Sequence, residues 1–204
     1  MQIKLDELSS PQTYFNMTQT VIPRPIAWIL TENEGGDYNL APYSYFNAIC
    51  SDPGMLIVSI GLQDDGREKD TLRNIRERSE FVIHIASCDQ LPDLNQTSAT
   101  LPPGESEVTM NNLQTTPVEG FHMPRLSDCK VAFMCERYDI QEIGNNKQHL
   151  LFAEIKEIYV DDDCTSVNEK GRMKIHADRI HPLGRLGASE YVSFGEILSA
   201  RRPA

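Results

Sequence analysis

The amino-acid sequence predicts a mainly β protein whose strands close into a small barrel. Short apolar runs rich in β-branched residues recur along the chain of 204 residues. Only one segment has clear helical periodicity, and turns containing Gly or Asn separate several of the runs. Six or more short strands at such close spacing favour a closed barrel. The predicted strands are 26–31, 55–61, 81–86, 130–140, 149–160 and a short one at 191–194.

The predicted turns fit this arrangement. Residues 34–37 read Glu-Gly-Gly-Asp, and Gly tolerates the positive φ that tight turns need. Residues 144–146, Gly-Asn-Asn, indicate a hairpin before the strand at 149–160. In that strand apolar and charged residues occur on both parities, so neither face is purely apolar. We therefore expect it to leave the core and reach solvent partway along its length.

One helix is predicted over 70–78. Leu72 and Ile75 lie three residues apart, and charged residues occupy the remaining face. Asp70 is expected as the N-cap, with its carboxylate accepting a backbone N–H from the first turn.

A long excursion is predicted over about 87–127. It is rich in Pro, Thr, Ser and Asn and indicates short helical turns and loops. An excursion of this length is more often a lid or a partner-contacting arm than a spacer. We therefore interpret residues 1–204 as one domain that carries this excursion.

Composition excludes several classes of function. The formal net charge of −11 and the pI near 4.9 argue against a nucleic-acid or anionic-membrane partner. No apolar run is long enough to span a bilayer, and the N-terminus lacks a secretory h-region. Five cysteines without CxxC spacing indicate reduced thiols and a cytoplasmic location. Scattered histidines predict no metal site, and the glycine and serine motifs of Rossmann, P-loop and Ser-hydrolase sites are missing.

The start of the predicted helix is a candidate phosphate site. Residues 67–78 hold five basic and three acidic residues, an excess of two positive charges in an acidic chain. Lys69 stands directly before the helix, whose free N–H groups and dipole favour an anion, and Thr71 adds a hydroxyl. The alternative is a capped helix with a solvated basic face that binds nothing.

Residues 39–47 are a candidate contact for a ring. Pro42 removes a backbone donor and interrupts central strand pairing, which leaves neighbouring amides and carbonyls free to face a ligand. Ser44 and Asn47 add polar side chains on either side of two aromatic residues. The alternative is an edge strand whose aromatic side chains belong to the core. With a phosphate site at one end and a ring surface at the other, the two segments match the needs of flavin mononucleotide (FMN).

Two further segments carry candidate residues. Arg24 lies between two prolines that hold it extended, where it could reach a phosphate, a carboxylate or a flavin edge. Trp28 is expected in the core. Near the C-terminus, Gly184 and Gly187 allow close backbone approach, while Arg185 and Tyr191 offer a donor and a ring. The alternative there is a loop that returns to a final strand.

These segments resemble the flavin reductase-like family, the FMN-binding split-barrel group that includes flavoredoxins and the reductase components of two-component monooxygenases. The resemblance rests on RPIAWILT (24–31), NLAPYSYFNAICSDPGMLIVSI (39–60) and KDTLRNIRERSEFVIHI (69–85). It continues through TSATLPPGESE (97–107) and LGRLGASEYVSFGE (183–196), so it covers nearly the whole chain. The chain departs from the family pattern at Gly54, where a second proline commonly follows SDP, and in the acidic QDDGRE stretch before Lys69.

The resemblance implies a homodimer of split β-barrels that binds FMN near the dimer interface. It places Asn39, Ala41, Pro42, Tyr43 and Ser44 along the flavin ring and ribityl chain. It places Ser44, Phe46, Asn47, Lys69, Asp70 and Thr71 around the phosphate, and Arg24 where the family approaches the flavin.

The implied chemistry is hydride transfer from NAD(P)H to flavin N5, as in an NAD(P)H:flavin oxidoreductase. The flavin makes and breaks the bonds, so no side chain is nominated as an acid or a base. A monooxygenase or another electron-transfer protein would accept the electrons. Two alternatives stay open: a flavoredoxin-like FMN electron carrier without turnover of free flavin, and a split barrel that has lost flavin and binds haem or nothing.

Overall fold

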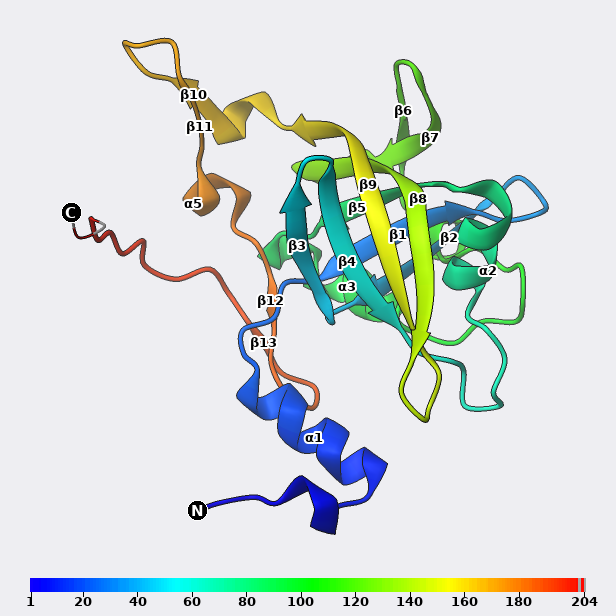
Figure 1. Ribbon diagram of the computed structural model, residues 1–204. Helices are drawn as coiled ribbons and strands as arrows, with labels where there is room; N and C mark the ends of the chain where they lie inside the picture. Colours follow the sequence, from blue (N-terminus) through cyan, green and yellow to red (C-terminus); the bar gives the residue numbers. More distant parts are fainter. Residues whose placement is uncertain (202, 204) are drawn as a thin grey trace.

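A seven-stranded antiparallel sheet forms the body of the protein (Figure 1). The computed structural model describes residues 1–201 and 203. The strand order in the sheet is β2-β1-β5-β8-β9-β4-β3. The strands are β1 (Ala27–Glu32), β2 (Tyr38–Tyr43), β3 (Phe46–Ser51), β4 (Gly54–Ile60), β5 (Glu80–Ile85), β8 (Val131–Ile143) and β9 (Gln148–Val160).

The sheet closes because β2 and β3 are two halves of one bent strand. The first half pairs with β1 and the second half pairs with β4. Only Ser44 and Tyr45 separate the two halves, and the N–H of Ser59 on β4 donates to the Tyr45 carbonyl at 2.8 Å. The two ends of the sheet therefore meet at residues 44–45. This confirms the predicted barrel.

The barrel encloses one apolar core. Side chains of one parity from the barrel strands point inward, for example Ile29, Val58 and Ile83. Helix α2 (Asp70–Arg78) covers this core with Leu72 and Ile75, the two residues whose spacing predicted the helix. The bounds of α2 match the prediction, and its amphipathic face explains where it packs.

A second core lies on the outer face of the same strands. Trp28 and Leu30, which alternate with the inward residues of β1, pack there. Most of the covering elements come from the predicted excursion: α3 (Leu91–Gln96), α4 (Glu107–Met110), β6 (Thr115–Val118) and β7 (Phe121–Leu126). The excursion is thus mostly a structural layer, and its hairpin β6–β7 was not predicted. Because β1 is buried on both faces, its sequence is a continuous apolar run.

His84 connects the barrel to this outer layer. It is fully buried, its Nδ1 lies 3.1 Å from the carbonyl oxygen of Trp28, and its Nε2 accepts the N–H of Leu126 at 2.9 Å. One ring nitrogen accepts a hydrogen bond, so the ring is neutral and donates from Nδ1. Burial lowers the pKa of His84 to about 4. A buried, hydrogen-bonded and neutral His84 is therefore part of the core.

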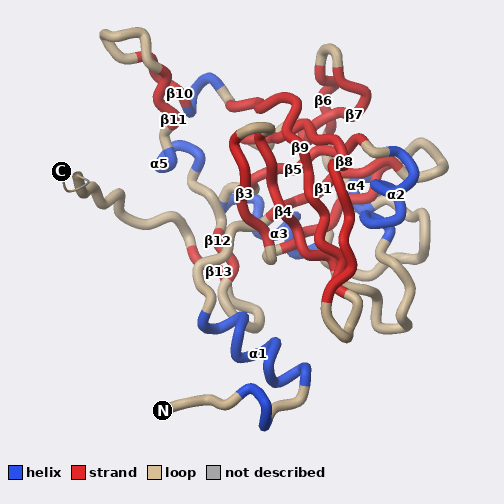
Figure 2. Tube along the Cα trace, viewed as in Figure 1, coloured by secondary structure: helices blue, strands red, loops and turns tan. Residues whose placement is uncertain are grey.

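Several elements stand away from the barrel (Figures 1 and 2). Helix α1 (Ser10–Thr20) precedes β1, and the hairpin of β10 (Thr165–Val167) and β11 (Met173–Ile175) projects on another side. Helix α5 (Ala177–Ile180) and the small pair β12 (Gly184–Arg185) and β13 (Tyr191–Val192) follow. Three short 3-10 turns complete the elements: η1 (Leu5–Glu7), η2 (Cys88–Gln90) and η3 (Asp162–Cys164). In the described part of the chain, no helix is long and apolar enough to cross a membrane.

The close backbone approach predicted at the C-terminal glycines is confirmed. A Cβ atom added to Gly187 would overlap Gln19 at the end of α1, and one added to Gly184 would lie 2.8 Å from a methyl carbon of Val192. Both turns predicted around residues 36 and 144 also occur, with Gly36 at φ 83° and Gly144 at φ 69°. Buried and half-buried residues alternate over 149–153 of strand β9, and residues 156–158 are exposed, so the strand reaches solvent partway along its length as predicted.

One local prediction was wrong. Lys69, not Asp70, is the N-cap of α2, and Asp70 is the first helical residue. Its carboxylate accepts the N–H of Gly104 at 3.3 Å and pairs with Arg73 at 2.7 Å. Asp70 therefore ties the helix to the excursion and does not cap its own first turn.

Candidate functional site

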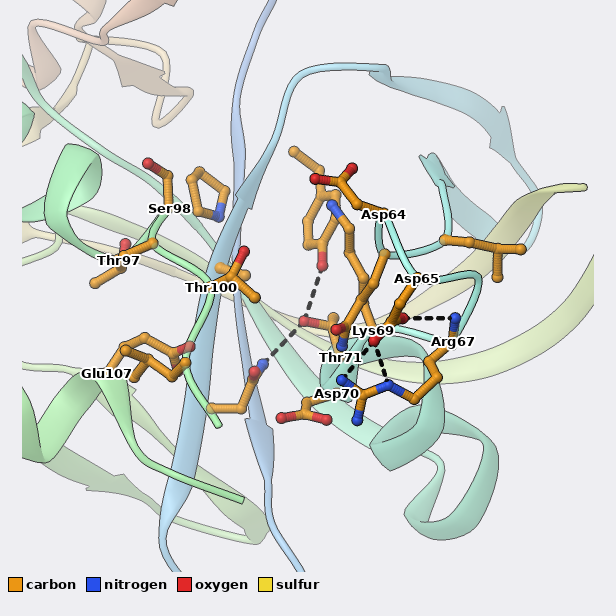
Figure 3. Close-up of a pocket in the computed structure, with 18 residues that line it drawn as sticks. Asp64, Asp65, Arg67, Lys69, Asp70, Thr71, Thr97, Ser98, Thr100 and Glu107 are labelled. Atoms are coloured by element: carbon orange, nitrogen blue, oxygen red, sulfur yellow. Dashed lines mark hydrogen bonds and ion pairs between the residues drawn. The ribbon is translucent and has the colours of Figure 1, made fainter. Parts of the chain in front are cut away.

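A cavity of about 490 Å³ opens between β2, the start of α2 and part of the excursion. Figure 3 shows residues 64–71 on one side of the cavity and residues 97–107 on the other. Seven of the predicted site residues line it: Asn39, Ala41, Pro42, Tyr43, Lys69, Asp70 and Thr71. Two segments far apart in sequence, 39–43 and 69–71, are therefore brought together as the phosphate-and-ring interpretation requires.

Lys69 supplies the cavity with a cation. Its Nζ lies 5.5 Å from the centre of the Tyr43 ring. Among the described residues, no carboxylate lies within ion-pair distance of this nitrogen. Burial lowers the pKa of Lys69, and the charge of Asp64 opposes that effect. A half-buried ammonium without an ion-pair partner gains most from an anionic ligand.

A buried hydrogen-bond network holds the inner wall. The Thr71 hydroxyl oxygen accepts from Asn39 Nδ2 at 2.9 Å and from the Tyr43 hydroxyl at 3.0 Å. Asn39 also donates to Thr31 at 3.1 Å, which joins the network to β1. Burial is the main cause that raises the pKa of Tyr43, so its hydroxyl remains a donor. The network fixes β2 to the start of α2 and sets the shape of the cavity.

The edge of β2 that faces away from β1 presents backbone carbonyl and N–H groups to its surroundings. Residues 38, 40 and 42 point their backbone groups away from β1: the Tyr38 carbonyl accepts from Ser106 at 2.6 Å, and the Leu40 N–H donates to Glu107 at 2.9 Å. Next along the same edge is Pro42, which has no N–H. At the cavity wall, the backbone of Pro42 therefore offers only its carbonyl oxygen.

The segment 97–101 forms the opposite wall, a role that the sequence did not predict. Thr97 anchors it: its hydroxyl accepts from Trp28 Nε1 at 2.8 Å and donates to the Leu94 carbonyl at 3.0 Å. Trp28 is buried in the outer core, as predicted. The tryptophan therefore acts on the cavity indirectly, by holding Thr97 in place.

Glu107 is another lining residue that was not among the predicted site residues. It is almost fully buried at the start of α4. Burial is the main cause that raises its pKa to about 7, and the hydrogen bond from Leu40 partly offsets that effect. The family resemblance covers residues 97–107 and so includes Glu107, but no motif shows that folding buries this carboxylate against a strand edge.

The remaining predicted site residues lie elsewhere. Arg24 is buried, and its guanidinium donates to the carbonyls of Val21 at 2.9 Å and Leu186 at 2.7 Å, and also to Ser44 Oγ at 3.3 Å. It lines neither the main cavity nor the neighbouring one, and it clamps the chain after α1 to the C-terminal segment. Phe46 and Asn47 lie with Arg24 on a separate, shallow groove. The structure thus places these three residues outside the main cavity.

A second cavity of about 370 Å³ adjoins the first. The two share Pro42, Tyr43, Lys69 and Ser98. Ser44 lines this second cavity, and so do Arg185 and Tyr191 from the C-terminal segment. Backbone hydrogen bonds of 3.0 and 2.9 Å between Arg24 and Arg185 bring that segment here.

Comparison with known proteins agrees with this geometry. The model of the flavin reductase like domain matches residues 17–175. An uncharacterized protein of Bacillus subtilis, YwrF, is 36% identical over 203 residues, which covers 98% of this chain and 97% of the relative.

Two solved structures are similar over almost the full length. Nitrilotriacetate monooxygenase component B from Bacillus cereus has a TM-score of 0.89 and 31% identity, covering 98% of each chain. The 2-nitrobenzoate 2-nitroreductase NbaA of Pseudomonas fluorescens has a TM-score of 0.87 and 28% identity, covering 100% of this chain and 96% of that one. With a family model that matches most of its length, the chain belongs to the flavin reductase like domain family.

Proposed function

We propose that this protein binds FMN in the main cavity and works as an NAD(P)H:flavin oxidoreductase. One observation carries the proposal. The Lys69 ammonium at the start of α2, which has no ion-pair partner among the described residues, lines the same cavity as Pro42 and Tyr43. Membership of the family supports a flavin-related oxidoreductase. The reaction and the electron donor are our inference.

The residues present fit FMN. The ammonium of Lys69 and the N-terminal N–H groups of α2 suit a phosphate. The Pro42 carbonyl is an acceptor without a neighbouring donor, so a ring that meets this edge must present an N–H, and a flavin has one at N3. The hydroxyls of Ser98 and Thr100 offer partners for a ribityl chain. Bound FMN would supply hydride acceptance at N5, while the protein would orient it and set its electrostatics.

The charges around the cavity suit one small anion. Asp64, Asp65 and Glu107 line it together with Lys69, and Arg67 is already paired with Asp65 at 2.7 Å. An additional anionic group would meet carboxylates without a free cation nearby. This pattern, in a chain of net charge −11, supports a small cofactor and not a polyanion.

The placement of the excursion favours a reductase over a closed electron carrier. Only residues 97–101 and Glu107 of the excursion line the main cavity, while most of the rest packs on the outer face of the barrel. The adjoining second cavity leaves room beside the Pro42–Tyr43 wall. A nicotinamide nucleotide could approach the flavin from there.

We also propose that the protein is a homodimer. On α1, which stands away from the barrel, Tyr14 and Phe15 are 62% and 53% exposed (Figure 1). On the projecting hairpin, Val167 and Met173 are 66% and 68% exposed. Strand β3 lies at the end of the sheet order and exposes most of its residues. A second copy would cover such surfaces, and light scattering after gel filtration would measure the mass.

The test is an absorption spectrum followed by anaerobic addition of NADH or NADPH. We expect the purified protein to bind FMN and the flavin band to bleach. Bleaching with rapid turnover of added FMN supports a reductase. Bound flavin that neither nucleotide reduces would refute the reductase assignment and leave the electron carrier. A protein that ignores FMN would refute the whole proposal.

A further inference from the structure

The second cavity differs from the first in charge. Lys69 and Arg185 line it, and none of its lining residues is an aspartate or a glutamate. The main cavity, in contrast, is lined by four carboxylates and two basic residues. A cavity whose charged lining residues, among those described, are both cations favours an anionic ligand, even in a chain of net charge −11.

Arg185 is held in place by neutral groups. Its guanidinium lies 4.4 Å from the centre of the Tyr191 ring. It donates to the carbonyl of Glu190 at 3.1 Å and to the carbonyl of Ala188. Among the described residues, no carboxylate lies within ion-pair distance of it. Its charge is therefore oriented but not neutralised, and a planar guanidinium suits a carboxylate geometrically.

The other walls suit a flat ring. The rings of Tyr14 and Tyr45 lie 6.1 Å apart with a tilt of 39°, and both line the cavity. Ile26 and Leu94 add apolar surface, while Asn95 and Gln148 add neutral polar groups. Aromatic walls with two cations and a few amides match a small planar acid better than a long flexible one.

We propose that the second cavity binds a small aromatic carboxylate, with Arg185 as the partner of its carboxylate group. The proposal rests on the proposed function in one respect: with FMN in the main cavity, the acid would lie beside the flavin, across the shared Pro42–Tyr43 wall. An aromatic acid would then be a second class of small molecule, besides the nicotinamide nucleotide, that reaches the flavin from this cavity.

The first experiment titrates the wild-type protein with benzoate, benzamide and cyclohexanecarboxylate. Heat of binding is measured by calorimetry, and the flavin spectrum is followed in FMN-loaded protein. We expect benzoate to bind at least about tenfold more tightly than benzamide, because only benzoate gains a charge-assisted hydrogen bond. It should also bind more tightly than the non-aromatic acid. Equal affinity for benzoate and benzamide, or no binding, would overturn the proposal.

The second experiment compares R185Q with R185K and with K174Q, which removes an exposed positive charge from the projecting hairpin. We expect R185Q to weaken benzoate binding about tenfold or more, R185K to weaken it less, and K174Q to leave it unchanged. Unchanged benzoate affinity in a folded R185Q protein would refute the role of Arg185. If R185Q raised the KM for NADH while benzoate did not bind, the cavity would belong to the electron donor and the proposal would be wrong.

These outcomes separate the two proposals. Calorimetry needs no flavin, so benzoate binding is measured even where FMN does not bind, and that pattern would refute only the function proposed above. FMN binding with reduction by NAD(P)H, but without benzoate binding, would refute only the aromatic-acid site.

Discussion

The replacement of Lys69 by alanine is the sharpest test of the main cavity. Lys69 is the one lining cation without an ion-pair partner among the described residues, because Arg67 is already paired with Asp65. The variant loses a charge-assisted hydrogen bond to the phosphate, which is typically worth about 1.5–3 kcal/mol. The dissociation constant for FMN should therefore rise by roughly tenfold to 150-fold, at about 1.4 kcal/mol for each factor of ten.

The assay is fluorescence quenching of FMN titrated with apo-protein at two salt concentrations. Lys174→Ala is the matched control, since it removes an exposed lysine far along the chain from the cavity. The wild-type affinity should fall with salt more steeply than that of the Lys69 variant, because a charge contact is screened. The midpoint of thermal unfolding should change little, because the one contact described for the Lys69 ammonium is with the Tyr43 ring. An FMN affinity equal to that of wild type would remove Lys69 from the site.

Three further perturbations test the fold around the site. The pKa of His84 is about 4 in the folded protein and 6.5 in the unfolded chain, because burial favours the neutral ring. Its contribution of roughly 3 kcal/mol to the free energy of unfolding is therefore present above pH 6.5 and lost as the pH falls to 4. Urea unfolding at several pH values measures this loss. The Glu107 pKa is raised to about 7, so its favourable contribution is present below pH 4.5 and lost as the pH rises through 7. Glu107→Gln keeps an acceptor for the Leu40 N–H and should stabilise the protein by up to roughly 3 kcal/mol at pH 8, and an unchanged pH dependence would contradict the burial argument. Gly187→Ala places a methyl group against Gln19 and should cost about 1–3 kcal/mol in the same unfolding assay, with a wild-type midpoint as the contrary result.

The strands of the barrel could be predicted because their pattern is local. Apolar residues at period two, or in short continuous runs, marked β1, β4, β5, β8 and β9. The bent strand formed by β2 and β3 was not among the predicted strands, and residues 39–47 were interpreted as a ring contact with an edge strand as the alternative, since Pro42 and the polar residues around it hide the alternation. Helix α1 was also missed, because its aromatic residues remain exposed and leave no buried face to read.

The candidate site was predictable to the extent that its residues form short motifs. Asn39 to Tyr43 and Lys69 to Thr71 line one cavity, and a resemblance to the family supplied them together. Arg24 shows the limit of that reasoning. Its guanidinium donates to the carbonyl of Leu186, which lies 162 residues away in the sequence. No local pattern shows that folding will give the guanidinium this hydrogen-bond acceptor. Glu107 was missed for the same reason, because the Leu40 N–H that it accepts becomes visible only after α4 packs on β2.

The site follows from the way in which the barrel closes. A strand that pairs first with β1 and then with β4 must bend, and at the bend its backbone groups lose their regular neighbours. Before the bend, the outer edge of β2 is covered at Leu40 by Glu107. Two residues later stands Pro42, which has no backbone N–H and therefore needs no hydrogen-bond acceptor. The strand can therefore border an open cavity at Pro42 without leaving a buried donor unpaired, and both cavities share this residue as a wall. Any other residue at this position would direct its backbone N–H toward the cavities, where no protein acceptor is described. Pro42 therefore allows the strand to close the barrel and also to border a ligand site.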